Sequence, residues 1–355
     1  MIFKFRRKPP RREVAPTQTL PERQSLAQPG ATHGLPLATY DQMQTDSMVE
    51  TALNVKKLGV LAAPWRIVAG SDLESQRRAS FVAKSFERME GSPLTILFGA
   101  MDAFAKGWSL QELVYRERDG KLWLHAVRPK DPNYFGIEVD AFGRVHDLRL
   151  RLPGETERIL PREKFVLFAH QGGYGNPKGR SDLDAAHRHW QAKQSLLAAW
   201  RLHLERFAMP TVLAKIARGL PVEDQTTLLS SLDNLHRITA LLVPEEIDID
   251  TLGGQKEPSS GFMEALEFHN REIARAILGQ TLTTDEGRRV GSLAMGKVHL
   301  QVMLLQLDAI RRTLADQVMT EQVIRPLVEL NFGPGPVPRF EFESSAARSF
   351  VTGQV

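Results

Sequence analysis

The chain of 355 residues contains no cysteine, which excludes disulfides, thiolate zinc sites and cysteine nucleophiles. It also has no apolar run that approaches the ~20 residues needed to span a bilayer. Met1–Phe5 hold too few apolar residues for the core of a signal peptide, so we expect no export. These absences favour a protein that assembles in a reducing cytoplasm without a membrane partner.

The sequence motifs of common enzymes are missing as well. The glycine-rich segment 172–181 lacks the order of a phosphate-binding loop, because Lys178 precedes Gly179 and Arg180 follows it. Neither an HExxH zinc motif nor a GxSxG nucleophile motif occurs. His187 and His189 are two residues apart on an expected helix and would point to different faces. We therefore expect a protein that is not an enzyme, with no catalytic residues, no cofactor and no metal site.

One enzymatic interpretation stays open as a rival. Asp248 and Asp250 would share one face of a strand, as would Glu138 and Asp140, and carboxylates placed in this way can bind Mg²⁺. A metal-dependent nuclease is therefore possible on geometric grounds. The absence of a lysine or a further acid at a useful spacing argues against it.

Composition and charge point to a folded body with a basic arm. Hydrophobic residues make up 42% of the chain and charged residues 25%, values typical of folded proteins, and the length allows two or three domains. Residues 1–37 are rich in proline, arginine and glutamine and carry seven lysines and arginines against two glutamates, so we expect a disordered basic arm. The rest of the chain is close to neutral, whereas a protein that grips nucleic acid over its whole surface carries its basic residues in the folded body.

The hydrophobic periodicity predicts an α+β protein. Helices are expected over Met43–Leu61, Arg77–Met89, Pro93–Ala105, Val222–His236 and Phe262–Leu278. Strands are expected over Pro64–Val68, Trp108–Tyr115, Lys121–Val127, Tyr134–Val139, Arg144–Leu152, Phe165–His170, Ile238–Val243, Ile247–Leu252 and Arg339–Glu343. The longest helix is expected from about Gly291 to Pro326, and its broad apolar stripe implies burial on more than one side.

An acidic segment interrupts this pattern. Between Val222 and Glu257 the chain carries eight acidic residues against two basic ones. Such a run suits a solvated surface or a surface that binds a basic partner.

Residues 170–210 form the most informative segment, a glycine-dense turn followed by a helix. Ser181 is the expected N-cap, and Asp182 and Asp184 lie in the first turn, where the helix dipole favours negative charge. Pro210 ends the helix. Residues spaced by three, four and seven positions share one face: Leu183, Ala186, Trp190, Leu197, Trp200, Leu204 and Phe207.

The order of residues in this segment resembles that of the Mu-like family of bacteriophage portal proteins. The matching positions are Tyr174, Gly175, Asn176, Pro177, Gly179, Ser181, Leu183, Trp190, Lys193, Glu205, Arg206, Phe207 and Pro210. Further matches lie in the same order at Leu58–Ile67, Gly107–Ser109 with Glu112, Gly279–Thr284, Ile324–Leu327 and Asn331–Gly333. The resemblance therefore covers most of residues ~45 to 333.

The resemblance implies the portal-protein fold, an α+β architecture with an α/β wing, a helical stem, a small α/β clip and a long C-terminal spine helix. The implied boundaries are a disordered arm at 1–37, a wing at 38–180, a first stem helix at 181–210, a clip at 211–259, a second stem helix at 260–279, a tunnel loop at 280–290, a spine helix at 291–330 and a short crown or tail at 331–355.

A portal protein forms a homo-oligomeric ring, usually of twelve subunits, at a unique capsid vertex. The resemblance implies a channel for packaging and ejection of double-stranded DNA. The implied partners are the terminase large subunit, the major capsid protein or scaffold, and a head-completion or neck protein, with no membrane. The implied location is the portal vertex of the virion, and the host cytoplasm during assembly.

Two sets of site residues follow from the resemblance. The tunnel loop would touch DNA through Gln280, Thr281, Thr283, Thr284, Arg288 and Arg289. The clip would bind terminase and neck proteins through Glu223, Asp224, Glu245, Glu246, Asp248 and Asp250. The rival interpretations are a metal-dependent phage nuclease and a minor head or adaptor protein, although adaptors are usually small and lack this succession of helices.

Overall fold

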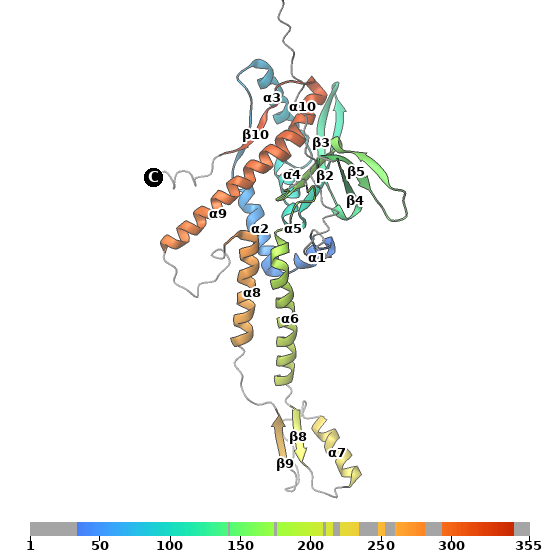
Figure 1. The fold of residues 1–355 in the computed structure, drawn as a ribbon, viewed down its shortest axis with the longest axis vertical. Helices are drawn as coiled ribbons and strands as arrows, with labels where there is room; N and C mark the ends of the chain where they lie inside the picture. The colour runs from blue at the N-terminus through green and yellow to red at the C-terminus, as the bar shows by residue number, and fades with distance from the viewer. Residues whose placement is uncertain are drawn as a thin grey trace, which may run out of the picture. The chain divides into compact units, whose positions relative to one another are not determined.

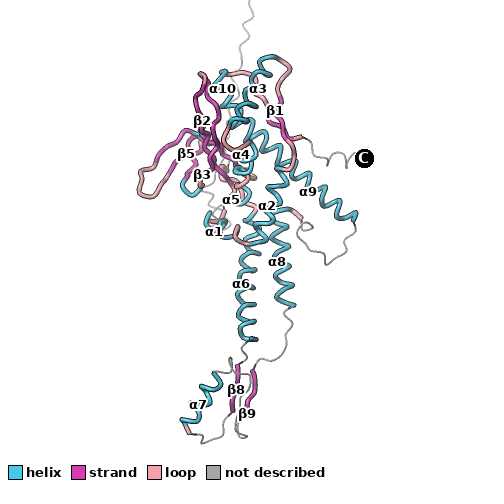
Figure 2. Tube along the Cα trace, turned by 180° about the vertical axis from the view of Figure 1, so that it is seen from behind, coloured by secondary structure: helices cyan, strands magenta, loops and turns pink. Residues whose placement is uncertain are grey.

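The computed structural model describes residues 34–140, 143–173, 176–208, 211–215, 221–233, 248–252, 260–280 and 293–343. The chain divides into two compact units, the first built from residues 1–187 and 271–355 and the second from residues 188–270. The course of the chain through each unit is drawn in Figure 1, and Figure 2 shows its helices and strands from behind. Both units mix helix and strand, which confirms the predicted α+β class.

The first part of the first unit contains five helices, with strand β1 (Trp65–Val68) between the second and the third: α1 (Leu37–Met43), α2 (Ser47–Leu61), α3 (Leu73–Arg88), α4 (Pro93–Ala100) and α5 (Ala103–Lys106). The prediction of one helix from Met43 to Leu61 was wrong at its start, because Asp46 caps α2 by accepting hydrogen bonds from the backbone N–H groups of Met48 and Val49. The single helix predicted over Pro93–Ala105 is likewise divided into α4 and α5.

Two antiparallel sheets follow. The first has the order β3-β2-β7 and contains β2 (Trp108–Arg118), β3 (Lys121–Lys130) and β7 (Phe165–Ala169). The second has the order β4-β5-β6 and contains β4 (Phe135–Val139), β5 (Val145–Leu150) and β6 (Arg158–Pro161). Trp108, Leu110, Leu148, Phe165 and Leu167 form a buried cluster shared by both sheets. The sequence did not predict β6, a short strand whose side chains are mostly exposed.

The C-terminal part of the first unit is one continuous run of helix. It consists of α9 (Leu293–Thr313), a π-helical segment η4 (Leu314–Ile324) and α10 (Arg325–Phe332). Pro326 does not end it, although the helix was expected to stop there: the hydrogen-bonding pattern changes from π to α at Arg325, next to the proline, and the helix continues to Phe332. After α10, β10 (Arg339–Phe342) pairs antiparallel with β1 (Trp65–Val68). Both strands were predicted from the sequence, but their pairing was not.

The π-helical segment is fastened to the first sheet by one side chain. Gln322 accepts a hydrogen bond from the backbone N of Leu167 (2.8 Å) and donates one to the backbone O of the same residue (2.9 Å). The segment is mostly buried. π-Helical geometry is rare beyond a single turn and is frequent at functional sites, so this helix is held in an uncommon form by its packing.

The second unit contains most of two long helices and a small module between them in sequence. α6 (Leu183–Ala208) and α8 (Ser260–Leu278) both extend from the first unit into the second. Between them come β8 (Thr211–Lys215), α7 (Val222–Asp233) and β9 (Asp248–Leu252), and β8 pairs antiparallel with β9. The sequence predicted β9 and α7 but missed β8, and the strand predicted at Ile238–Val243 lies outside the described residues.

The predicted apolar face of α6 is buried only near its start. Leu183 and Ala186 have no exposed surface, whereas Leu197 is 38% and Leu204 50% exposed. In the second unit Trp200 stacks on Phe262 of α8, with ring centroids 6.3 Å apart and an angle of 12° between the planes. The single chain thus leaves part of a regular apolar stripe uncovered.

Candidate functional site

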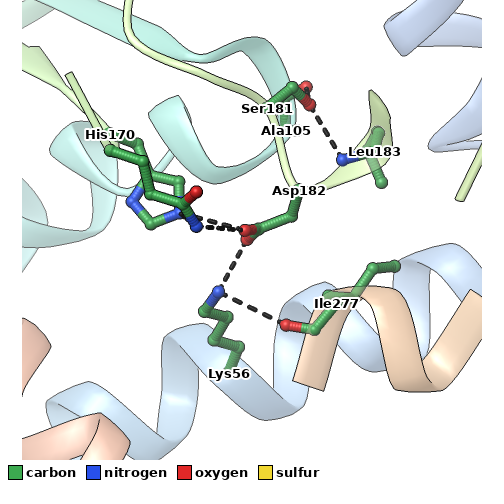
Figure 3. A network of polar contacts seen from close by, with 8 residues as sticks. Lys56, Ala105, His170, Ser181, Asp182, Leu183 and Ile277 are labelled. Carbon is green, nitrogen blue, oxygen red and sulfur yellow. Dashed lines mark hydrogen bonds and ion pairs between the residues drawn. The ribbon is translucent and has the colours of Figure 1, made fainter. Parts of the chain in front are cut away.

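A buried charge network lies where α6 begins (Figure 3). The Asp182 carboxylate accepts a hydrogen bond from Lys56 Nζ at 2.6 Å and lies 3.0 Å from His170 Nε2. Lys56 Nζ also donates to the carbonyl oxygen of Ile277, at 3.3 Å, in the last turn of α8. A carboxylate at a helix N-terminus and an ammonium at a helix C-terminus both complement the helix dipoles. One lysine on α2 therefore joins the start of α6 to the end of α8.

Aromatic rings complete the surroundings of this network. Lys56 Nζ lies 4.8 Å from the centroid of the Phe104 ring, and the His170 ring meets the same phenyl group edge to face at 4.8 Å. The backbone N of Asp182 donates to the carbonyl oxygen of Phe104 at 2.9 Å. The Lys56 and Asp182 side chains are 12% and 4% exposed, so each charge depends on the other in a region that water hardly reaches.

The turn before α6 is shaped by glycine and serine. Ser181 donates to the carbonyl oxygen of Ala105 (2.5 Å) and accepts from the backbone N of Leu183 (2.9 Å), which confirms its predicted role as N-cap. Gly179 has a φ of +57°, and a Cβ there would lie 2.3 Å from the carbonyl oxygens of Gly107 and His170. The glycines of this segment thus serve close backbone packing. Tyr174 and Gly175 lie outside the described residues.

A third helix is attached at the same place. The hydroxyl of Tyr40 in α1 donates to the Asp184 carboxylate at 2.5 Å and accepts from the backbone N of Leu35 at 2.8 Å. Burial and the neighbouring Asp184 raise the pKa of Tyr40, so the phenol stays protonated and remains a donor. The first turn of α6 is therefore held by side chains from α1 and α2 and by the turn that precedes it.

The predicted tunnel-loop residues are described only at their first position. Gln280 is 7% exposed, and its Nε2 lies 3.5 Å from the Met303 sulfur on α9, so its side chain packs inside the first unit. The other predicted positions lie outside the described residues: Thr281, Thr283, Thr284, Arg288 and Arg289.

The predicted clip residues fall on two elements. Glu223 is exposed in the first turn of α7, and Asp224 follows it. On β9, Asp248 is in register with Lys215 and Asp250 with Leu213. Glu245 and Glu246 lie outside the described residues.

Two of the carboxylates that could have supported a metal site have other partners. Glu138 forms an ion pair with Arg149, and Asp140 accepts a hydrogen bond from the backbone N of Arg144, so these two acids have other partners. Across the described part of the chain, no group of three or more histidines, cysteines or acids is placed to hold a metal ion. Within those same ranges no helix is long and apolar enough to cross a membrane.

Sequence reasoning missed several residues that organise the first unit. Lys56 pairs with Asp182, 126 residues away, and His170 contacts the same carboxylate from 12 residues away; no local pattern marks either residue. Arg78 is 2% exposed and donates to the carbonyl oxygens of Gly333 (3.2 Å) and Pro336 (3.4 Å). Asn331 exchanges two hydrogen bonds with the backbone of Leu122, at 2.9 and 2.8 Å. The segment Asn331–Gly333 resembles the portal family, but its contact with β3 has no signal in a single sequence.

Residues 37–350 match the model of a protein family described as the portal protein of Mu bacteriophage. The portal protein of Escherichia phage Mu is 26% identical over 302 residues, which cover 82% of this chain and 56% of the relative. The Mu-like prophage FluMu protein gp29 of Haemophilus influenzae is 25% identical over 343 residues, which cover 88% of this chain and 61% of the relative. The chain thus spans less than two thirds of the length of these curated relatives.

Solved structures agree in fold. A chain from the neck of a native gene transfer agent particle, computed with C12 symmetry, matches with a TM-score of 0.63 at 13% identity, over 90% of this chain and 88% of that one. An HK97 family phage portal protein from Corynebacterium diphtheriae matches with a TM-score of 0.51 at 13% identity, over 91% of this chain and 99% of that one. At these identities the likeness concerns the fold, and it confirms the predicted portal-type architecture.

Proposed function

The chain belongs to the family of portal proteins of Mu bacteriophage, and from this premise we propose that it forms the portal ring at one vertex of a phage capsid. The ring is the channel through which double-stranded DNA is packaged and ejected. It also docks the terminase large subunit, a head-completion or neck protein, and the major capsid protein or scaffold. The chain acts as a structural conduit without catalytic chemistry.

The observation that carries this proposal is the network around Lys56. A stem of two helices needs a fixed base if it is to keep its form while DNA moves past it. Lys56 contacts Asp182 at the start of α6 and Ile277 at the end of α8, and Tyr40 adds a further contact to Asp184. These contacts support the assignment of α6 and α8 as the two stem helices.

The remaining elements follow the order of the family. Residues 38–180 supply the wing, and residues 211–259, with β8, α7 and β9, supply the clip. In the family's order residues 280–290 would be the tunnel loop, and α9, η4 and α10 would be the spine. Residues 331–355 form a short C-terminal segment, in which β10 pairs with β1.

Charge fits a channel that DNA passes through. Strong phosphate contacts would stall movement, and the chain outside its basic arm is close to neutral. Arg288 and Arg289 would make transient contacts with phosphates beside the tunnel-loop residues Gln280, Thr281, Thr283 and Thr284. Glu223, Asp224, Glu245, Glu246, Asp248 and Asp250 would give the clip a negative surface for basic regions of terminase and neck proteins.

Exposed apolar side chains supply surfaces for ring closure. They lie on α6 and α8 of the second unit and on α9 of the first: Leu197, Leu204, Met263, Phe268, Leu300 and Leu305. Exposed apolar surface of this kind marks an interface. A ring needs two different surfaces of each subunit to meet and close by rotation.

Electron microscopy of the purified full chain tests the proposal directly. We expect class averages of a twelvefold annulus with a central hole. Leu204→Asp should weaken the ring, because it places a charge on an apolar surface. Ser195→Asp is the matched control, since Ser195 is exposed on α6 about half a turn away from Leu197. A wild-type chain that stays monomeric, with or without scaffold protein, would refute the proposal.

The nuclease alternative is supported only by Asp248 and Asp250 on β9. Incubation of the full chain with duplex DNA and Mg²⁺ or Mn²⁺ tests it. Metal-dependent cleavage that is lost in Asp248→Ala with Asp250→Ala would replace the conduit by an enzyme. Intact DNA under the same conditions supports the conduit.

A further inference from the structure

The elements α3, β3 and α10 contact one another in the first unit, whose course is drawn in Figures 1 and 2. Three aromatic rings gather there. The ring of Phe81 on α3 lies 4.7 Å from that of Trp123 on β3 and 5.3 Å from that of Phe332 on α10, measured between centroids. They border an open pocket of about 370 Å³ that is also lined by Arg77, Lys84 and Lys121.

Basic side chains are packed against these rings. Lys121 Nζ lies 4.8 Å from the centroid of Phe81 and 4.6 Å from that of Phe332. The guanidinium carbon of Arg88 lies 4.5 Å from the Trp123 centroid. A cation held over an aromatic face keeps its charge and can still attract an anion. The rings therefore hold Lys121 in the lining of the pocket and Arg88 against Trp123 beside it.

These cations lack acidic partners within the described ranges. Arg77, Lys84, Arg88 and Lys121 form no ion pair there. Neighbouring arginines form ion pairs with acidic side chains: Arg78 with Glu74, Arg118 with Asp119 and Arg128 with Glu90. The exposed Glu87 of α3 forms no ion pair with any of the four. Arg78, Arg118 and Arg128 are thus neutralised, whereas Arg77, Lys84, Arg88 and Lys121 keep four positive charges together.

The spacing of the exposed cations fits a continuous line of negative charge. Arg77, Lys84 and Arg88 are seven and four residues apart and therefore lie on one side of α3. They cover ~16 Å at a rise of ~1.5 Å per residue. Duplex DNA carries about one charge per 1.7 Å of its axis, so phosphates fall within reach of each cation. An acidic peptide would have to place separate carboxylates at matching positions.

We propose that Arg77, Lys84, Arg88 and Lys121, the α3 patch, bind the phosphate backbone of double-stranded DNA without regard to sequence. The patch lies on α3 and β3, elements other than the tunnel loop, so this binding is additional to any contact that the loop makes with DNA. The near-neutral charge of the chain as a whole conceals it.

DNA binding by the full chain tests the patch. Fluorescence anisotropy of a short labelled duplex is measured over a series of salt concentrations. Arg77→Gln with Lys84→Gln should weaken binding roughly ten- to a hundredfold at low salt and reduce the slope of log K against log salt by about two. Lys164→Gln with Arg312→Gln is the control. Both residues are exposed and have no ion pair in the described ranges, and the two substitutions remove the same charge as those in the patch.

Each outcome decides the proposal. Equal losses in the two double variants would refute it, since the effect would then be one of net charge. Polyglutamate is titrated in parallel, and binding of polyglutamate but not of DNA through the patch would also refute it. Electron microscopy of the same variants separates this inference from the portal proposal, because loss of DNA binding with an intact assembly concerns the patch alone. Unchanged circular dichroism shows that the variants are folded.

Discussion

Replacement of Asp182 by alanine is expected to lower the free energy of unfolding by about 3–5 kcal/mol, because it leaves a buried ammonium without its carboxylate. Lys56 would keep only the Ile277 carbonyl at 3.3 Å and the Phe104 ring at 4.8 Å. His170 would lose its acceptor at 3.0 Å in the same step. Whole domains have a free energy of unfolding of only about 5–15 kcal/mol, so the loss of this one carboxylate would remove a large part of it.

Denaturation by urea, followed by tryptophan fluorescence at one fixed protein concentration, measures the effect. Glu205→Ala is the control, because its ion pair with Arg201 is exposed, at 55% and 83%, and should contribute no more than about 1 kcal/mol. The double variant Lys56→Met with Asp182→Ala should cost clearly less than the sum of the two single variants, since it leaves neither charge unpaired.

Two results would refute this reasoning. If Asp182→Ala cost no more than Glu205→Ala, the carboxylate would not be holding Lys56 in place. If the costs of the two single variants simply added, Lys56 and Asp182 would act independently, and the network could not be the base of the stem.

Three further predictions concern the first unit. Gly179→Ala should lower stability by more than about 2 kcal/mol, because a left-handed conformation alone costs about 1–2 kcal/mol and the added Cβ would strike a carbonyl oxygen; thermal melting beside Gly173→Ala, where a Cβ meets nothing within 4 Å, checks this. Gln322→Ala should cost about 1–3 kcal/mol in urea denaturation, since it leaves the buried backbone groups of Leu167 without partners; no loss of stability would contradict this role. Burial raises the pKa of Tyr115 from 10.0 to about 12, so the folded chain keeps a proton that the unfolded chain releases, and stability should fall as pH rises through this window. Tyr115→Phe should reduce this fall, with denaturation at several pH values as the measurement, and an identical pH profile would contradict the assignment.

The local pattern of the sequence was enough to find most of the secondary structure. The strands around Trp108 and Phe165 alternate or run apolar, and their central residues are buried in the first sheet. The failures occurred where another contact decides the structure. Asp46 divides a helix that periodicity alone would continue, and β8 forms because β9 pairs with it.

The site was predictable at its turn and not at its charges. Ser181 and Gly179 predict a capped helix after a tight turn. The N-cap role of serine and the turn role of glycine depend on residue type and on near neighbours in the sequence. Lys56 lies 126 residues from Asp182, and such a pairing is fixed only when the helices pack together. The α3 patch escaped notice for the same reason, because a count of charges along the chain does not show which of them are neutralised in space.

The pairing of β1 with β10 has a consequence for biosynthesis. Residues 65–68 emerge early from the ribosome, yet their partners at 339–342 are made after the whole second unit has been synthesised. During that interval the edge of β1 is an unpaired strand, which is the kind of surface on which nascent chains aggregate. A chain released before residue 339 would keep this edge unpaired. Such truncated subunits would therefore be prone to aggregate and would be substrates for protein quality control in the host cell.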